Sequence, residues 1–192
     1  MRRSLAKGPV KVAELLQRAH ADESGVPGLA RDMLSVLSSQ LDALEVKLKA
    51  IETQLMALHK QDPMSQCLAT QPGIGPIGAI SFTLKVTDPK GFRSGRHFAA
   101  SLGLTPKENS SGGRHRPGRI SRQGDQGLRK LLVLGATAVI RFAKAGRASP
   151  WLINLLARRP KKLVAVALAN KMARILWAMM VSGETYRRPQ QA

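Results

Sequence analysis

An unbroken heptad pattern between residues 34 and 58 constrains the fold of this chain more than any other feature. Apolar residues recur at alternating spacings of three and four, which places them on one stripe of an α-helix. Pro27-Gly28 is a typical helix start and Asp62-Pro63 a typical stop, so the sequence predicts one long helix between them. The a and d positions of the pattern are Leu34, Leu37, Leu41, Leu44, Leu48, Ile51, Leu55 and Leu58.

This helix needs a partner for its apolar stripe, and two partners fit the sequence. One is a second copy of the chain in a coiled coil, where the complementary charges of Lys47 and Glu52 suit parallel strands. The other is an intramolecular bundle whose second stripe consists of Val12, Leu15 and Leu16. We favour self-association and expect a homo-oligomer.

Charge divides the chain into two parts. Residues 1–70 hold 9 basic and 8 acidic residues, whereas residues 71–192 hold 22 basic and 4 acidic ones. The formal net charge of +19 therefore lies almost entirely in the second part and indicates a polyanionic partner, of which nucleic acid is the commonest. Aromatic residues make up only 4% of the chain, so we assign Trp151 and Trp177 to the core rather than to base stacking.

The remaining composition excludes several classes of protein. A single cysteine, Cys67, excludes a disulfide scaffold and a cysteine-rich zinc module. No apolar run is long and uncharged enough to span a membrane, and the N-terminus lacks the apolar stretch of a signal peptide. We expect a cytoplasmic, nucleoid-associated all-α protein with no membrane partner, consisting of a coiled-coil segment (1–65) and a helical domain (66–192).

A glycine-rich turn opens the second part. Gly73, Gly75 and Gly78 match the G-x-G-x-x-G pattern of dinucleotide-binding folds, but no β-branched strand precedes them and no acidic residue follows about twenty positions later. The Pro-Gly-Ile-Gly run from residue 72 is instead typical of a helix-hairpin-helix turn, with Ile74 buried as its plug. Such a turn directs backbone N–H groups at a phosphate, so Gly73 and Gly75 are candidate nucleic-acid-binding residues. A purely structural turn is the alternative.

Residues 85–122 are polar, glycine-rich and cationic, interrupted by a short apolar helix at 98–102. Within them, Ser110-Ser111-Gly112-Gly113 places two hydroxyls beside glycines and arginines, the residue types that a strand-attacking nucleophile needs. A phosphate clamp with ordinary turn serines is the alternative. Two lysines also begin the last helix, where the macrodipole favours a bound anion. The candidate phosphate contacts are Lys107, Arg114, Arg116, Arg119, Arg122, Lys161 and Lys162.

Three helices are predicted after this segment: 126–145 capped by Asp125, 150–156 capped by Ser149, and 163–181 ended by Gly183. The second part of the chain has too few carboxylates for a two-metal nuclease site, and we predict no metal ligands in it. Its acidic residues are Asp88, Glu108, Asp125 and Glu184.

Five motifs occur in an order typical of one family. They are PGIG from residue 72, FAASLGLTP from 98, SSGG from 110, GRISRQGD from 118 and LRKLL from 128. Together with the closing RRPKK and ALANKMAR runs, they resemble the C-terminal domain of the DEDD-type insertion-sequence transposases, relatives of the Piv invertases. The resemblance covers residues 66–188, and the heptads resemble the coiled coil that joins the two catalytic domains of these proteins.

The resemblance implies a DNA recombinase whose C-terminal domain supplies a serine nucleophile for strand exchange. In the family a serine precedes a glycine at this place, which falls on Ser111, with Ser110 as runner-up. An N-terminal RNase-H-like domain supplies four metal-binding acids, and a structured noncoding RNA guides the protein to DNA. This chain holds no such acidic domain, so we expect no cofactor in it, with a divalent metal only in that domain, and DNA binding without transposition. A non-catalytic nucleic-acid-binding remnant is the alternative function.

Overall fold

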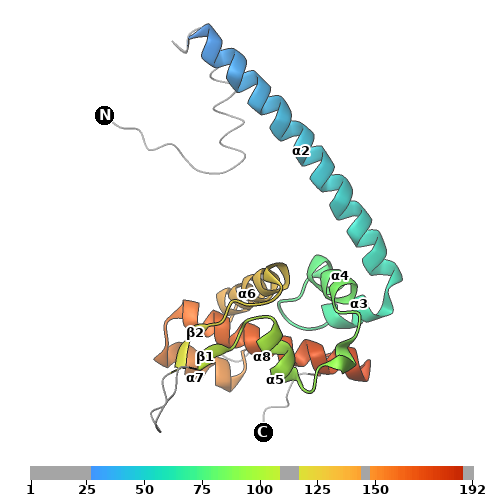
Figure 1. Cartoon of the computed structure of the whole chain (residues 1–192), viewed down its shortest axis with the longest axis vertical. Coiled ribbons are helices and arrows are strands. Elements are labelled where there is room, and N and C mark those ends of the chain that lie inside the picture. The colour runs from blue at the N-terminus through green and yellow to red at the C-terminus, as the bar shows by residue number, and fades with distance from the viewer. Residues whose placement is uncertain (1–26, 109–116, 144–147, 188–192) are drawn as a thin grey trace. The chain divides into compact units, whose positions relative to one another are not determined.

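The computed structural model describes residues 27–108, 117–143 and 148–187, and contacts divide the chain into two units, residues 1–54 and 55–192. The described residues are mostly helical, which confirms the predicted all-α class, with one small sheet added (Figure 1). The elements are α2 (Gly28–Gln61), α3 (Pro63–Ala69), α4 (Pro76–Lys85), η2 (Pro89–Gly91), α5 (Gly95–Ser101), β1 (Pro106–Glu108), β2 (Pro117–Ile120), α6 (Gln126–Arg141), α7 (Pro150–Arg158) and α8 (Lys161–Ser182).

Helix α2 begins and ends where the sequence predicts. Asp62, which follows its last residue, caps the next helix, because its carboxylate accepts a hydrogen bond from the Met64 N–H at 2.9 Å. No residue of α2 is buried, and the heptad side chains from Leu37 to Ile51 are 47–58% exposed. The long helix is therefore confirmed, while the coiled coil stays a prediction. The alternative stripe of Val12, Leu15 and Leu16 lies outside the described residues.

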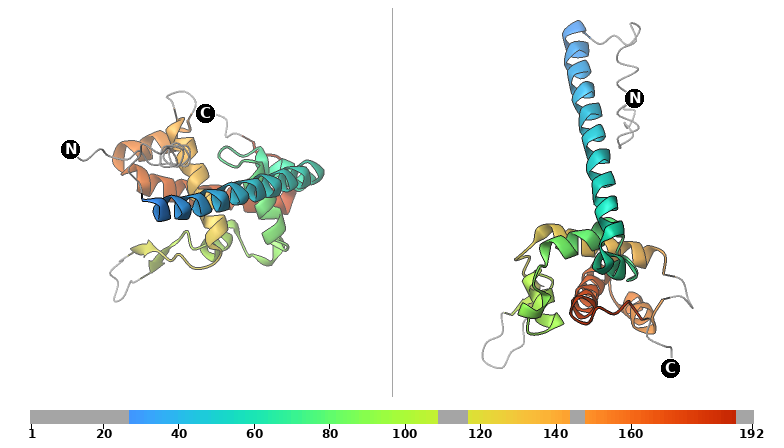
Figure 2. Two further views of the ribbon diagram at one scale, coloured as in Figure 1. Left: turned by 90° about the horizontal axis from the view of Figure 1, so that it is seen from above. Right: turned by 90° about the vertical axis from the view of Figure 1, so that its right-hand side faces the viewer.

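Helix α8 is the centre of the second unit. Its buried side chains form two rows with a spacing of four residues, one of larger side chains and one of alanines. Helices α3, α5, α6 and α7 and the short η2 all contact it (Figure 2). The alanine row allows close approach and the larger row fills the space between helices. The rows are Val164, Leu168, Met172, Leu176 and Met180, and Ala165, Ala169 and Ala173.

Among the described helices, only α8 is long and apolar enough to cross a membrane by length and composition. Nine of its residues are buried in the core of the second unit. It also carries the charged side chains of Lys171 and Arg174 in mid-helix. Burial against the neighbouring helices therefore accounts for its apolar composition.

The caps predicted for the later helices are present. The Asp125 carboxylate accepts from the Leu128 N–H at 2.7 Å, and the Ser149 hydroxyl accepts from the Leu152 N–H at 3.4 Å. Gly183 ends α8 with a left-handed φ of 74°. The predicted end of α6 at Ala145 is wrong. The helix stops at Arg141, because the Ala143 N–H turns back to the Ile140 carbonyl, three residues away, and tightens the last turn.

The sequence predicts neither the short η2 nor the antiparallel pair β1–β2. Pro106 pairs with Ile120 and Glu108 with Pro117, with a bulge between them. Prolines and charged residues at these positions give almost no strand signal, since they are rare in strands.

Helices α3 and α4 are joined by a turn that packs against α6 and α8. Ile74 in this turn is 6% exposed, which confirms it as a buried plug. Gly73 has a φ of 88°, and a Cβ on it would lie only 2.8 Å from the Gly135 carbonyl oxygen. A Cβ on Gly135 would in turn overlap the Gly73 carbonyl oxygen. The two backbones therefore touch where neither residue has a side chain.

We expect Gly135→Ala to destabilise the protein, although alanine favours a helix over glycine by about 1 kcal/mol. The added methyl group meets a backbone carbonyl that cannot swing aside, and overpacking costs about 1–3 kcal/mol, so we expect a net loss of about 1 kcal/mol. Gly28→Ala, where nothing lies within 4 Å, is the matched control. Denaturant unfolding followed by circular dichroism measures both variants, and equal stability would contradict this close packing.

Candidate nucleic-acid interface

An open groove follows α8 in the second unit. It is bordered by α5, the end of β2, the start of α7 and the α3–α4 turn. Among the described residues, seven basic side chains line it but only one acidic side chain, Glu184, which pairs with Arg187 at 3.6 Å. Such an excess of positive charge suits a polyanion. The basic residues are Arg96, Arg119, Arg122, Lys162, Lys171, Arg174 and Arg187.

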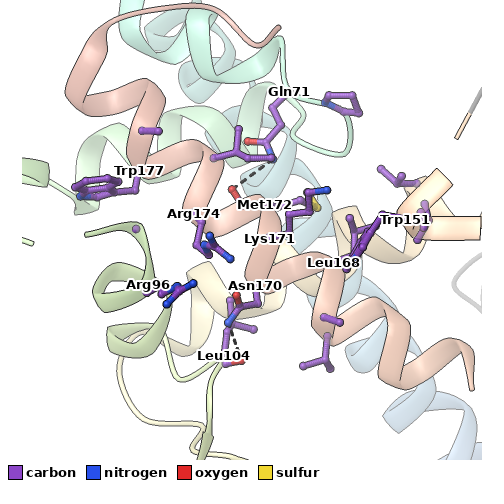
Figure 3. A pocket seen from close by; sticks show the side chains of 18 of the residues that line it. Gln71, Arg96, Leu104, Trp151, Leu168, Asn170, Lys171, Met172, Arg174 and Trp177 are labelled. Atoms are coloured by element: carbon purple, nitrogen blue, oxygen red, sulfur yellow. Dashed lines mark hydrogen bonds between the residues drawn. The ribbon is translucent and has the colours of Figure 1, made fainter. Parts of the chain in front are cut away.

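Two arginines from different helices extend toward one another in this groove (Figure 3). Arg96 comes from α5 and Arg174 from α8, and both are exposed. Gly95 permits this approach, because a Cβ on it would lie 3.1 Å from the Arg174 carbonyl oxygen. Within the described part of the chain, neither guanidinium has a carboxylate partner. Two guanidinium groups that enter one groove without a carboxylate partner favour an anion beside them.

Lys171 lies one helical turn before Arg174, and its ammonium nitrogen is 4.5 Å from the centre of the Trp151 ring. Trp151 is 39% exposed, so the prediction that it belongs to the core is wrong. The Ser149-Pro150 start of α7 places it in the first turn, at the edge of the groove. Trp177 does pack on the core as predicted, and its indole N–H donates to the Pro89 carbonyl at 2.9 Å.

Two amide side chains fix the floor of the groove. Asn170 donates from Nδ2 to the Leu104 carbonyl at 3.2 Å, and Gln71 donates from Nε2 to the Met172 carbonyl at 3.4 Å (Figure 3). Gln71 is 2% exposed, and its Oε1 has no hydrogen-bond partner. These bonds tie α8 to two separate loops and so hold the cationic side chains between them in place.

Helix α6 supports the end of the groove near the sheet. Arg129 donates from Nη1 to the carbonyls of Leu102 and Gln123, at 3.0 and 2.8 Å. Lys85 pairs with Asp125 at 2.8 Å, and this hydrogen bond, followed by that from the Leu128 N–H, lowers the pKa of the Asp125 carboxyl. The charge of Lys85 is thus neutralised locally, whereas Arg119 and Arg122 remain open to a ligand.

The structure brings together some of the sequence-predicted contacts and not others. Arg119, Arg122 and Lys162 line the groove, whereas Lys107 and Lys161 are exposed outside its lining. Gly75 is exposed and begins α4 without a side-chain cap, while Gly73 faces α6 and α8. The remaining candidates lie outside the described residues: Ser110, Ser111, Arg114 and Arg116.

Sequence reasoning missed Arg96, Trp151, Lys171 and Arg174 as members of one site. The sequence does hold a signal for Lys171 and Arg174. Their charges lie three residues apart in an otherwise apolar helix, so they must share an exposed face. For Arg96 and Trp151 no local signal exists, since their proximity depends on how α5 and α7 pack against α8.

The described residues offer no metal site, because no three His, Cys, Asp or Glu side chains gather among them. Cys67 has a structural contact instead. Its thiol donates to the Glu184 carbonyl at 3.2 Å, and burial raises its pKa, which keeps it protonated.

Comparison with known proteins shows a match to one family model over part of the chain. Residues 65–149, which include the α3–α4 turn, the β1–β2 pair and α6, match a transposase domain. The matching model is that of the IS116/IS110/IS902 transposase family.

Similarity extends over nearly the whole chain. A protein of Sinorhizobium fredii named as a transposase is 47% identical over 188 residues, which cover 96% of this chain and 48% of that protein. A Pseudomonas aeruginosa protein named as a family 20 transposase is 44% identical over 95% of this chain and 55% of its own length. The pilin gene-inverting protein of Moraxella bovis is 27% identical over 59% of this chain and 35% of its own length. The chain thus spans about half the length of the transposases that it matches.

Proposed function

We propose that this chain is the C-terminal part of an IS116/IS110/IS902 family transposase and that it binds DNA through the α8 groove. The observation that carries the proposal is the groove lining, with seven basic side chains against one acidic side chain. The relatives support a role in DNA recombination, because they are named as transposases and as a gene-inverting protein. The protein acts in the cytoplasm, where it associates with the nucleoid.

Phosphates bind at two places in this proposal. The Arg96–Arg174 pair holds one phosphate by charge-assisted hydrogen bonds, and Arg119 and Arg122 extend the track toward the sheet. A second phosphate contacts the first N–H groups of α4, which Gly75 leaves uncapped by any side chain. A structured guide RNA has the same backbone chemistry and is a second ligand for these surfaces.

The catalytic step uses a serine between β1 and β2. In this step Ser111 Oγ forms a bond to a DNA phosphorus, the bond from phosphorus to a deoxyribose oxygen breaks, and the serine proton passes to that oxygen. Attack by a hydroxyl of another strand then releases the serine and completes the exchange. Ser110 is the second candidate.

The divalent metal belongs to a separate acidic domain in this proposal. A non-catalytic nucleic-acid-binding remnant is the second candidate function, and the basic lining of the groove suits it equally. Both functions need the groove, but only the first needs the serine.

DNA affinity should fall steeply with salt. If six to ten phosphates are engaged, binding to a labelled duplex weakens about 10³–10⁵-fold between about 50 and 200 mM salt. Arg96→Ala and Arg174→Ala should each lower the salt slope by about one, because each removes one phosphate contact. Lys49→Ala, on the exposed surface of α2, should leave the slope unchanged. Fluorescence anisotropy measures the slopes, and a slope near zero on both duplex DNA and structured RNA would reject the proposal.

The heptad seam should set the oligomeric state. Leu44→Pro, or Leu41→Asp combined with Leu48→Asp, should give a monomer, since these changes break the helix or charge the a and d positions. The matched control is Val36→Asp combined with Val46→Asp, which charges exposed apolar residues away from the seam. Sedimentation velocity distinguishes the species, and a monomeric unmutated chain would favour the intramolecular bundle.

Ser111→Ala should abolish strand exchange in a longer protein that carries the acidic domain. DNA affinity should stay within about threefold, because the change removes the nucleophile but no cationic contact. Arg114→Ala and Arg116→Ala should instead weaken binding. A covalent protein–DNA adduct that is lost only in Ser110→Ala would move the nucleophile by one residue. Normal recombination by both Ser110→Ala and Ser111→Ala would contradict a serine nucleophile and favour the non-catalytic nucleic-acid-binding function.

A further inference from the structure

We infer that the α8 groove holds an unpaired nucleotide, with its base stacked on Trp151 and its phosphates on Lys171 and Arg174. The inference rests on the proposed function and specifies the kind of nucleic acid that enters the groove. It concerns a part of the chain, α7 and α8, that lies beyond the matched transposase segment at 65–149.

The position of Trp151 is the first argument. A tryptophan that served only the core would be buried, but this side chain is 39% exposed at the edge of a groove with cationic walls. Leu163, which also lines the groove, is 51% exposed, so this end of the groove is apolar as well as open. An aromatic surface suits the apolar face of a nucleotide base. The cations beside it suit the charged phosphate of the same nucleotide.

The positions of the cations are the second argument. The Lys171 ammonium lies 4.5 Å from the centre of the indole ring, so a base stacked on the exposed part of the indole has its sugar-phosphate beside a positive charge. Arg174 follows three residues later on the same face of α8, with a Cβ about 5–6 Å away. In Figure 3 Lys171 extends toward Trp151 and Arg174 toward Arg96, so a strand that passes over α8 has a cation on either side.

Base pairing determines which nucleic acid can stack on Trp151. In a duplex the faces of the bases are covered by their neighbours, and the groove edges offer no face to an indole. Stacking on Trp151 therefore requires a base that is free of its duplex, as in a gap, a bulge or a displaced strand. Unpaired DNA and unpaired RNA share this chemistry.

The test compares duplex and gapped probes on the full chain. Binding is measured by anisotropy with a short labelled duplex, with the same duplex carrying a central single-stranded adenine gap, and with the RNA version of the gapped probe. Trp151→Leu should weaken binding to a gapped probe about tenfold, in the range of one stacked base, and change duplex affinity by less than about twofold. Trp151→Phe should restore most of the loss, because it keeps a π-face. The salt slope should not change, since no charge is removed.

Ile153→Ala is the matched control, because Ile153 is also exposed on α7, at 40%, but lies outside the groove lining. Quenching of tryptophan fluorescence by an unlabelled gapped probe gives a second readout, and it should disappear in Trp151→Phe, which leaves only Trp177. A selective loss with the DNA probe or with the RNA probe supports the inference and identifies the source of the nucleotide.

Equal weakening of duplex and gapped binding by Trp151→Leu, or no weakening of either, would overturn the inference and leave the Lys171–Trp151 contact as a structural one. In that case a steep salt dependence of duplex binding would still support the proposed function. If the unmutated chain binds none of the probes, the proposed function itself fails.

Discussion

Burial of one face of α8 is the interaction on which the rest of the domain depends. Each of its larger buried side chains contributes about 1.5–3 kcal/mol relative to exposure, so the Val164 to Met180 row contributes on the order of ten kcal/mol before entropy is counted. Repulsion between two exposed like charges a few ångström apart is about 1 kcal/mol in comparison. Packing therefore determines where Lys171 and Arg174 lie, and repulsion between such exposed charges is too small to oppose it.

Backbone contacts hold the loops around this helix. Gly73 lies against Gly135, and a Cβ on Gly124, which has a φ of 75°, would overlap the Ser101 carbonyl oxygen. Arg129 then joins the Leu102 and Gln123 carbonyls on either side of that second contact. As a result, the β1–β2 pair and the groove floor are packed together, although they come from distant parts of the sequence.

Local chemistry explains which features the sequence could predict. Caps and stops act within a few residues, so Asp125, Ser149 and Gly183 mark their helix ends correctly. The heptads likewise predict α2, and the buried Ile74 follows from the Pro-Gly-Ile-Gly turn. The β1–β2 pair depends on contacts between strands of three and four residues with little strand propensity, and the groove depends on the packing of α5 and α7 against α8. The prediction that Trp151 belongs to the core is wrong for the same reason, because its exposure depends on how the helices pack.

The composition of the groove also limits what this domain can recognise. Arginine and lysine side chains that contact phosphates bind every sequence about equally well, because phosphates are the same at every position. Most uncharged polar side chains in the lining already bond within the protein: Gln71 and Asn170 donate to backbone carbonyls, and Ser94, Ser149 and Ser182 accept from backbone N–H groups, which leaves few to distinguish one base from another. If the groove binds nucleic acid as proposed, selection of one sequence over another therefore depends on contacts outside it.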